Sequence, residues 1–155
     1  MELKLSVKEN KILKPFKFNN IRQTIELSGL DRISPAILYT VFFYKSQLAN
    51  ESFSQEEDPV ERAKTALQKA LIPWYPVAGR FRINEASGKL EIDCNNQGII
   101  LVTAATDSKL EELGRLHEYK SCYENLVPKF PEATDISENP IAVVQVWIFS
   151  MRKKF

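Results

Sequence analysis

Alternating apolar and polar residues predict strands in the first third of the chain. Residues 3–7 (LKLSV) alternate as the side chains of a half-buried strand do, and the run ends at Pro15. Residues 24–28 form a second, shorter candidate strand. Residues 37–44 (ILYTVFFY) are rich in aromatic and β-branched types. This composition predicts a third strand, buried on at least one face.

A helix is predicted to begin at residue 59. Asp58 is a good N-cap, Pro59 suits the first helical position, and Glu61 places a carboxylate in the first turn. Apolar residues then recur at helical spacing and trace one stripe: Val60, Ala63, Leu67, Ala70, Leu71 and Trp74. Pro73 and Pro76 should end the helix.

The middle of the chain has the pattern of a hairpin-rich sheet. Residues 80–83, 90–93 and 99–103 resemble strands, and turn-forming residues separate them at 86–88 and 95–98. We therefore expect these three strands to form one sheet that is flanked by the preceding helix.

Weaker signals follow before the last apolar run. Residues 108–111 (SKLE) match a capping box in front of a short helix, which Gly114 could end in a left-handed conformation. Residues 115–140 contain Pro128 and Pro131 and predict a loop with a helical turn.

Residues 141–149 (IAVVQVWIF) contain no charge and predict a strand buried on both faces. Such a segment, with many β-branched and aromatic residues and no proline within it, is also prone to pair with other chains. We expect self-association through this strand, with Val144→Lys or Val146→Lys improving solubility if the edge is exposed. Together the elements predict one α/β domain, with α+β as the alternative.

Composition excludes several classes of protein. The 155 residues are 44% hydrophobic, which is typical of a folded domain, and carry a net charge of +1, which argues against a nucleic-acid partner. No uncharged stretch approaches the roughly 20 residues of a membrane span, and the first residues lack the apolar core of a signal peptide. Cys94 and Cys122 show no metal-binding or disulfide spacing. We expect a cytoplasmic protein without a membrane partner.

The residues by themselves indicate no active site. His117 is the sole histidine, and its charged neighbours in a poorly patterned region are typical of a surface residue rather than a general base or metal ligand. The chain has no nucleophile elbow, no HExxH metal motif and no glycine-rich phosphate loop. We predict no catalytic residue, no metal site and no bound cofactor.

Five blocks in order nevertheless resemble the BAHD superfamily of plant acyl-CoA-dependent acyltransferases, the hydroxycinnamoyl, benzoyl and acetyl transferases of specialised metabolism. These blocks are residues 27–31 (LSGLD), 42–45 (FFYK), 66–67 (AL) through 71–80 (LIPWYPVAGR), 90–95 (LEIDCN) with Gly98, and 145–149 (QVWIF). The resemblance implies a two-domain fold like that of chloramphenicol acetyltransferase, with a solvent channel between the domains. It also implies acyl-CoA as co-substrate and a small-molecule hydroxyl or amine as acyl acceptor.

The family's catalytic motif, HxxxDG, follows the strand that residues 145–149 resemble. In this chain residues 150–155 (SMRKKF) stand there instead, and His117 has Ser121 rather than an aspartate four positions on. We therefore interpret residues 1–149 as an incomplete N-terminal acyltransferase region and residues 150–155 as a divergent basic tail. The expectation is a truncated acyltransferase that is inactive alone, and the alternative is a noncatalytic binding or interaction module derived from such an enzyme.

The resemblance also gives candidate substrate-binding residues. In the family, the strand that residues 37–44 resemble faces the substrate channel, and its alternation assigns Leu38, Thr40 and Phe42 to the channel side. The alternative is that these three side chains pack in an ordinary core. Arg80, although charged, is interpreted as structural because its block lies at a helix-to-strand turn.

Overall fold

A computed structural model describes residues 5–17, 23–33, 37–44, 58–130 and 133–150. Over these residues the strands are β1 (Leu5–Leu13), β2 (Thr24–Glu26), β3 (Arg80–Ile83), β4 (Leu90–Asp93), β5 (Ile99–Thr106) and β6 (Val143–Phe149). The α-helices are α1 (Gly29–Ile33) and α2 (Pro59–Ala70). Four 3₁₀ helices are η1 (Tyr75–Ala78), η2 (Leu110–Leu113), η3 (Ser121–Leu126) and η4 (Ile136–Glu138). The mixture of sheets and helices confirms the predicted α/β class.

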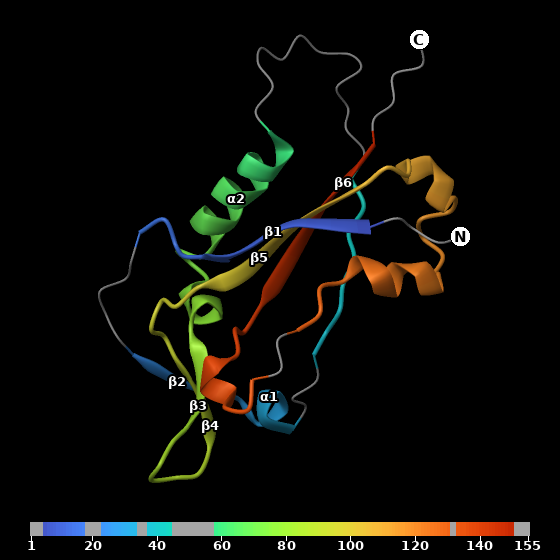
Figure 1. The fold of residues 1–155 in the computed structure, drawn as a ribbon. Coiled ribbons are helices and arrows are strands. Elements are labelled where there is room, and N and C mark those ends of the chain that lie inside the picture. The colour runs from blue at the N-terminus through green and yellow to red at the C-terminus, as the bar shows by residue number, and fades with distance from the viewer. Residues whose placement is uncertain (1–4, 18–22, 34–36, 45–57, 131–132, 151–155) are drawn as a thin grey trace.

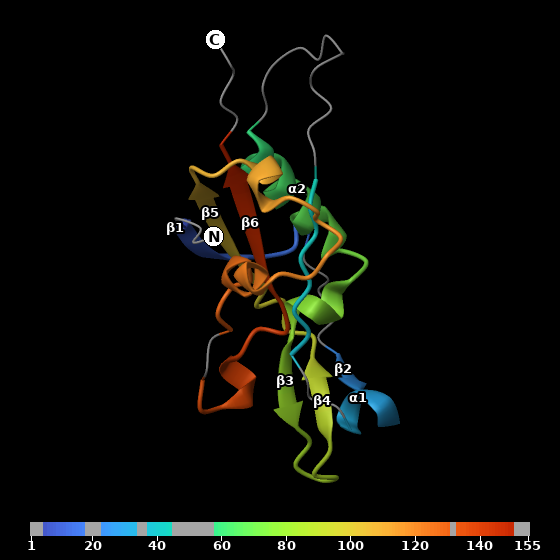
Figure 2. The same ribbon diagram turned by 90° about the vertical axis from the view of Figure 1, so that its right-hand side faces the viewer.

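The described strands form two small sheets rather than one (Figure 1). In the first, β5 lies between β1, which is antiparallel to it, and β6, which is parallel. In the second, β4 lies between β2 and β3, both antiparallel to it. Figure 2 shows the second sheet projecting from the end of the first.

The hairpin-rich single sheet predicted for the middle of the chain is therefore only half right. β3 and β4 do pair as a hairpin, but the turn after β4 carries the chain into the other sheet. Asn96 and Gly98 adopt positive φ angles of 55° and 91° in this turn. A Cβ atom at Gly98 would lie 2.5 Å from the Leu13 carbonyl oxygen, so only glycine fits where β5 begins beside β1.

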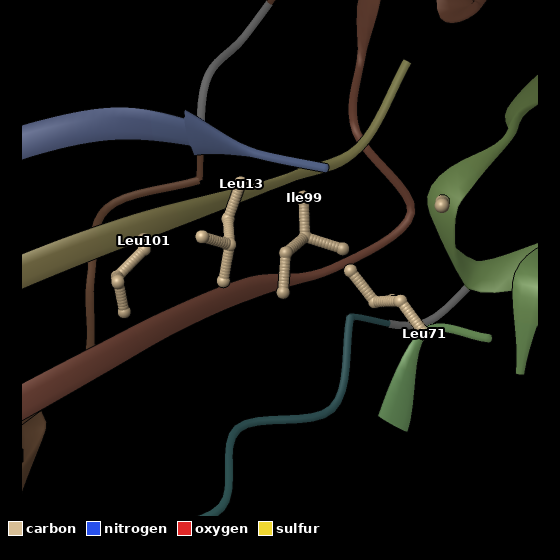
Figure 3. Close-up of a cluster of buried hydrophobic side chains, with 5 residues drawn as sticks. Leu13, Leu71, Ile99 and Leu101 are labelled. Carbon is tan, nitrogen blue, oxygen red and sulfur yellow. The ribbon is translucent and has the colours of Figure 1, made fainter. Parts of the chain in front are cut away.

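A first hydrophobic cluster lies where the first sheet meets α2 (Figure 3). Its buried members are Leu13, Leu71, Ala78, Ile99 and Leu101. Leu67, Val77, Ala142, Val144 and Val146 pack against them. This cluster joins β1, β5, β6 and the C-terminal end of α2 into one core.

The predicted start of α2 is confirmed, and its predicted stripe is only partly confirmed. The Asp58 side chain accepts a hydrogen bond from the Val60 amide, and Pro59 lies in the first turn. Leu67 and Leu71 contact the core, but Trp74 is 68% exposed because the helix ends at Ala70 before the stripe is complete. No helix in the described part of the chain is long and apolar enough to cross a membrane.

β6 is covered on both faces, as predicted, yet each of its residues is only half-buried. Val144 and Val146 pack on the first cluster, whereas Trp147 and Phe149 pack on a second cluster formed by Leu113, Tyr123 and Leu126. The side chains of Gln145 and Trp147 both donate hydrogen bonds to the Leu126 carbonyl, at 2.9 and 2.7 Å. Among the described strands β6 has one neighbour, β5, so its other edge is open.

The capping box predicted at residues 108–111 is wrong. The N-cap of η2 is Lys109, which makes no side-chain capping bond, and the helix is of the 3₁₀ type. Gly114 follows the helix with a φ of 69° and a ψ of −132°, so its φ is positive but it does not adopt the predicted left-handed helical conformation. The stretch that was expected to be loop with one helical turn contains η3 and η4.

Candidate functional site

Residues 37–44, which carry the candidate substrate contacts, do not form the predicted strand. They run as an open trace, cyan in Figure 1, without an element assignment. The pattern of burial nevertheless alternates at the C-terminal end of the segment. Val41 and Phe43 are half-buried, and Thr40, Phe42 and Tyr44 are exposed. The predicted period is therefore present, but hydrogen-bonded strand neighbours are not among the described residues.

Leu38, Thr40 and Phe42 lie on the exposed side of this segment. Leu38 is 89% exposed and Phe42 is 72% exposed, and the Thr40 side chain also faces solvent. The assignment of these three side chains to a substrate channel rather than to a core stays a prediction. The three side chains form an apolar and hydroxyl-bearing row that is free to contact another molecule or another part of a polypeptide.

The opposite side of the segment is held by the second hydrophobic cluster. Val41 and Phe43 pack against Leu113, Tyr123 and Leu126. The rings of Phe43 and Tyr123 have centroids 5.1 Å apart and are tilted by 57°, within the range of favourable aromatic pairs. This packing fixes one face of residues 41–43 and leaves the other face outward.

Arg80 occupies a junction between the two sheets, which supports its interpretation as a structural residue. Its side chain is 6% exposed, and Nη1 donates hydrogen bonds of 2.7 Å to the carbonyls of Gly79 and Gly98. Its backbone also forms a bridge with Pro140. Burial lowers the pKa of the guanidinium, and Nε is buried without a hydrogen-bond partner. Arg80 thus ties the start of β3 to the start of β5.

Glu91 in β4 forms a second polar arrangement that the sequence did not reveal. The buried carboxylate accepts a 3.1 Å hydrogen bond from Asn84 and a 2.5 Å charged hydrogen bond from Arg82. These bonds, first that of Asn84 and then that of Arg82, lower the pKa of Glu91. Because the carboxylate is already fully engaged across the β3–β4 hairpin, the arrangement is structural rather than catalytic.

The remaining ionisable and nucleophilic residues do not converge on one point. The His117 side chain is 79% exposed, and its nearest carboxylate, Glu118, lies 3.9 Å away, which agrees with the prediction of a surface histidine. Cys122 lines a hollow of 230 Å³ together with Glu112, Leu113, Lys120 and Ser121. This hollow is smaller than the roughly 300–1,000 Å³ of typical small-molecule sites. The Lys120 ammonium donates to the Leu113 carbonyl, so it is already engaged.

Comparison with known proteins supplies the identity that this geometry leaves open. A family model described as "Transferase family" matches residues 3–151. Brassinosteroid-related acyltransferase 1 of Arabidopsis thaliana is 39% identical over 136 residues, which are 87% of this chain and 29% of that protein. Rosmarinate synthase of Plectranthus scutellarioides is 36% identical over 149 residues, which are 95% of this chain and 32% of that protein.

The fold is also similar to that of a solved plant enzyme. The crystal structure of vinorine synthase superposes with a TM-score of 0.66 at 21% sequence identity, covering 94% of this chain and 35% of that one. The chain belongs to the BAHD acyltransferases of plants and matches an N-terminal portion of such an enzyme. Its fold is accordingly a part of the chloramphenicol-acetyltransferase-like fold. Enzymes of this family use acyl-CoA and small-molecule acceptors.

The chain spans about a third of the length of the relatives that it matches, 29% and 32% of the two acyltransferases and 35% of vinorine synthase. Two thirds of each relative therefore lie outside the matched region.

Proposed function

We propose that these 155 residues supply the N-terminal framework and part of the acceptor-side channel wall of an acyl-CoA-dependent acyltransferase. The reaction is transfer of an acyl group, other than an aminoacyl group, from acyl-CoA to a hydroxyl or amine of a specialised metabolite. The observation that carries the proposal is the outward row of Leu38, Thr40 and Phe42, presented on a chain of this family. We further propose that the protein is cytoplasmic, in keeping with two unpaired cysteines, Cys94 and Cys122.

The chemistry of the reaction explains why the 155 residues are expected to be inactive alone. The acceptor oxygen or nitrogen attacks the thioester carbonyl, its proton passes to a base, and the CoA thiolate leaves as the new acyl bond forms. A positioned general base contributes typically 10²–10⁴-fold, and donors at the developing oxyanion contribute further. The sole histidine, His117, is exposed and does not belong to an HxxxDG motif. In the described part of the chain, the hollow lined by Cys122 contains neither His117 nor Leu38 nor Phe42.

An assay of free CoA release tests this proposal. The 155-residue chain is incubated with coumaroyl-, benzoyl- or acetyl-CoA and a panel of alcohols and amines. We expect no turnover above the protein-free rate. A fusion of residues 3–149 to the unmatched part of rosmarinate synthase should, in contrast, release CoA in the presence of that enzyme's acceptor.

Controls in this assay identify which residues carry the activity. In the fusion, Phe42→Ala should raise KM for the acceptor more than it lowers kcat, whereas Trp74→Ala, at an equally exposed aromatic residue, should change neither. Turnover by the 155-residue chain alone that is abolished by His117→Ala would contradict the proposal.

A second candidate function is a noncatalytic interaction module, which the exposed aromatic side chains of residues 37–44 favour. Sequencing the transcript beyond the codon for Phe149 separates the two candidates. A reading frame that continues into an HxxxDG motif supports the enzyme, and a stop codon after Phe155 supports the module.

A further inference from the structure

The segment that follows β1 packs against the C-terminal end of α2 (Figure 1). The Phe16 amide donates a 3.1 Å hydrogen bond to the Gln68 carbonyl, and the Gln68 side-chain amide donates a 3.3 Å hydrogen bond to the Lys14 carbonyl. The Gln68 carbonyl is available because the helix tightens in its last turn, where the Ile72 amide donates to the Lys69 carbonyl instead. These bonds bring two segments that are 54 residues apart in the sequence to one corner of the molecule.

Large apolar side chains are exposed at this corner. Phe16, Ile72 and Trp74 are 62%, 40% and 68% exposed, although Leu71 beside them belongs to the buried first cluster. The Trp74 amide donates a 3.2 Å hydrogen bond to the Ala70 carbonyl, which keeps Trp74 within one turn of the helix end. Exposed apolar side chains that lie together on a surface indicate an interaction site.

Three lysines lie at the same corner without carboxylate partners. Lys14, Lys17 and Lys69 are exposed, and none of them forms a salt bridge within the part of the chain that the structure describes. Lys11 and Lys64 of β1 and α2, in contrast, pair with glutamates at 2.8 and 3.1 Å. The corner therefore presents positive charge beside exposed apolar side chains. We name it the α2 corner and define it by six residues: Lys14, Phe16, Lys17, Lys69, Ile72 and Trp74.

A membrane surface with anionic lipids fits this combination better than a protein partner does. Tryptophan rings are enriched at membrane–water interfaces, and a lysine stem can follow an apolar surface while its ammonium group stays in water. Anionic headgroups attract such lysines, and each lysine strengthens binding about fivefold. Interfaces between proteins are instead depleted in lysine.

We propose that the α2 corner docks the protein on the surface of a membrane that contains anionic lipids. The Phe16 and Trp74 rings enter the headgroup region, and the three lysines lie close to the charged headgroups. The expectation of no membrane partner rests on the absence of a spanning segment and of a signal peptide from the sequence, and docking on a surface needs neither. The inference goes beyond the proposed function and does not depend on it.

Co-sedimentation with lipid vesicles tests the docking. The 155-residue chain is mixed with vesicles of phosphatidylcholine and with vesicles in which about 30% of the lipid is phosphatidylserine. We expect the chain to bind only the vesicles that contain phosphatidylserine, and to bind them more weakly when the salt is raised from about 0.1 M to about 0.5 M. The triple variant Lys14→Gln, Lys17→Gln, Lys69→Gln should bind them more weakly on the order of 100-fold.

Two controls separate the α2 corner from net charge and from unfolding. The matched triple variant Lys8→Gln, Lys89→Gln, Lys129→Gln removes the same charge from exposed residues elsewhere, and its binding should fall less than about fivefold. Both triple variants change exposed residues only and should keep the wild-type Tm. Tryptophan emission should shift to shorter wavelength when vesicles are added, and Trp74→Phe should abolish this shift, because Trp147 is half-buried in the fold.

Several results would overturn the docking. These are equal binding to both kinds of vesicle, equal losses in the two triple variants, and an emission shift that persists in Trp74→Phe. Binding to poly-glutamate but not to vesicles would mean that the partner is an acidic polypeptide, and would overturn the proposal as well. A fusion of residues 3–149 to the unmatched part of rosmarinate synthase that unfolds cooperatively should bind the same vesicles. If this fusion does not bind them, the added part covers the α2 corner and the proposal is wrong.

Discussion

Replacing Arg80 should destabilise the chain, because this residue links the two sheets. The Arg80 guanidinium donates two hydrogen bonds of 2.7 Å, to the carbonyls of Gly79 and Gly98. Hydrogen bonds from a charged donor contribute about 1.5–3 kcal/mol each, so the two together represent roughly 3–6 kcal/mol. Against this stands the buried Nε without a partner, which costs about 1–3 kcal/mol. The difference spans about 0–5 kcal/mol, with its midpoint at about 2–3 kcal/mol.

Arg80→Met removes both the hydrogen bonds and the buried charge, and should therefore lower the free energy of unfolding by about 2–3 kcal/mol. For a chain of this size, each kcal/mol shifts the Tm by about 2–4 °C, so the expected loss is roughly 4–12 °C. Arg80→Lys should be at least as damaging, because it keeps a buried charge but loses the fork that reaches two carbonyls. Arg62→Met, at an exposed residue of α2, is the matched control and should stay within about 0.5 kcal/mol.

Urea unfolding followed by tryptophan fluorescence measures these differences. Trp147 is half-buried and bonded to the Leu126 carbonyl, so its emission shifts to longer wavelength when the sheet opens, whereas Trp74 is already exposed. Measurements at about 1 μM keep association through β6 small. If Arg80→Met and Arg62→Met unfold at the same urea concentration, the hydrogen bonds of Arg80 do not stabilise the junction, and the argument is wrong.

Three further predictions follow from individual side chains. Tyr123→Phe should leave the free energy of unfolding unchanged or raise it, because the buried hydroxyl has no hydrogen-bond partner; a loss above about 1 kcal/mol in the same urea titration would contradict this. Hydrogen bonds from Asn84 and Arg82 hold the pKa of Glu91 in the folded chain below its ordinary value of 4.5. The ionised carboxylate therefore stabilises the fold above pH 4.5, and this stabilisation is lost as the pH falls through the pKa of the folded chain. Glu91→Gln should therefore lose less Tm than the wild type between about pH 5 and pH 3. Ile148→Lys, at a half-buried residue of β6 outside both clusters, should reduce self-association in size-exclusion chromatography at tens of micromolar, and a wild type that is already monomeric there would refute association through this strand.

The choice of Ile148 corrects the substitutions suggested by the sequence. The sequence predicts that Val144→Lys and Val146→Lys improve solubility if the strand edge is exposed, but both side chains pack on the first cluster. A lysine there would place a charge against Leu101 and Ile99 and destabilise the core. Among the strands that the structure describes, the outer backbone edge of β6 has no partner, although these side chains are packed.

Local signals in the sequence predicted most elements correctly. The Asp58 N-cap with Pro59 marks the start of α2, and the uncharged run that ends at Phe149 marks β6. These predictions succeed because capping and side-chain period are decided by neighbours in the sequence. The separation of β4 from β5 could not be foreseen, because it depends on which distant strand, β1 or β2, each one meets.

The candidate site shows the same limit. Burial alternates from Thr40 to Tyr44, because side-chain direction along an extended segment is local, whereas residues 37–40 are all exposed. Strand pairing is a property of two segments, and composition alone cannot supply the second one. Arg80 illustrates the opposite case, since its two carbonyl partners lie 1 and 18 residues away and only the fold reveals the longer contact.

The pairing of β1 with β5 has a consequence for how the protein folds during its synthesis on the ribosome. Leu5 lies opposite Thr106, so about a hundred residues must be synthesised before the first strand meets its neighbour. At roughly 5–20 residues per second, β1 emerges and waits for about 5–20 s with its edges unpaired. During that interval chaperones and neighbouring nascent chains compete with β5 for the same backbone groups. The yield of folded protein in a cell should therefore depend on translation speed between the codons for Leu13 and Ile99, a stretch whose described strands all belong to the second sheet.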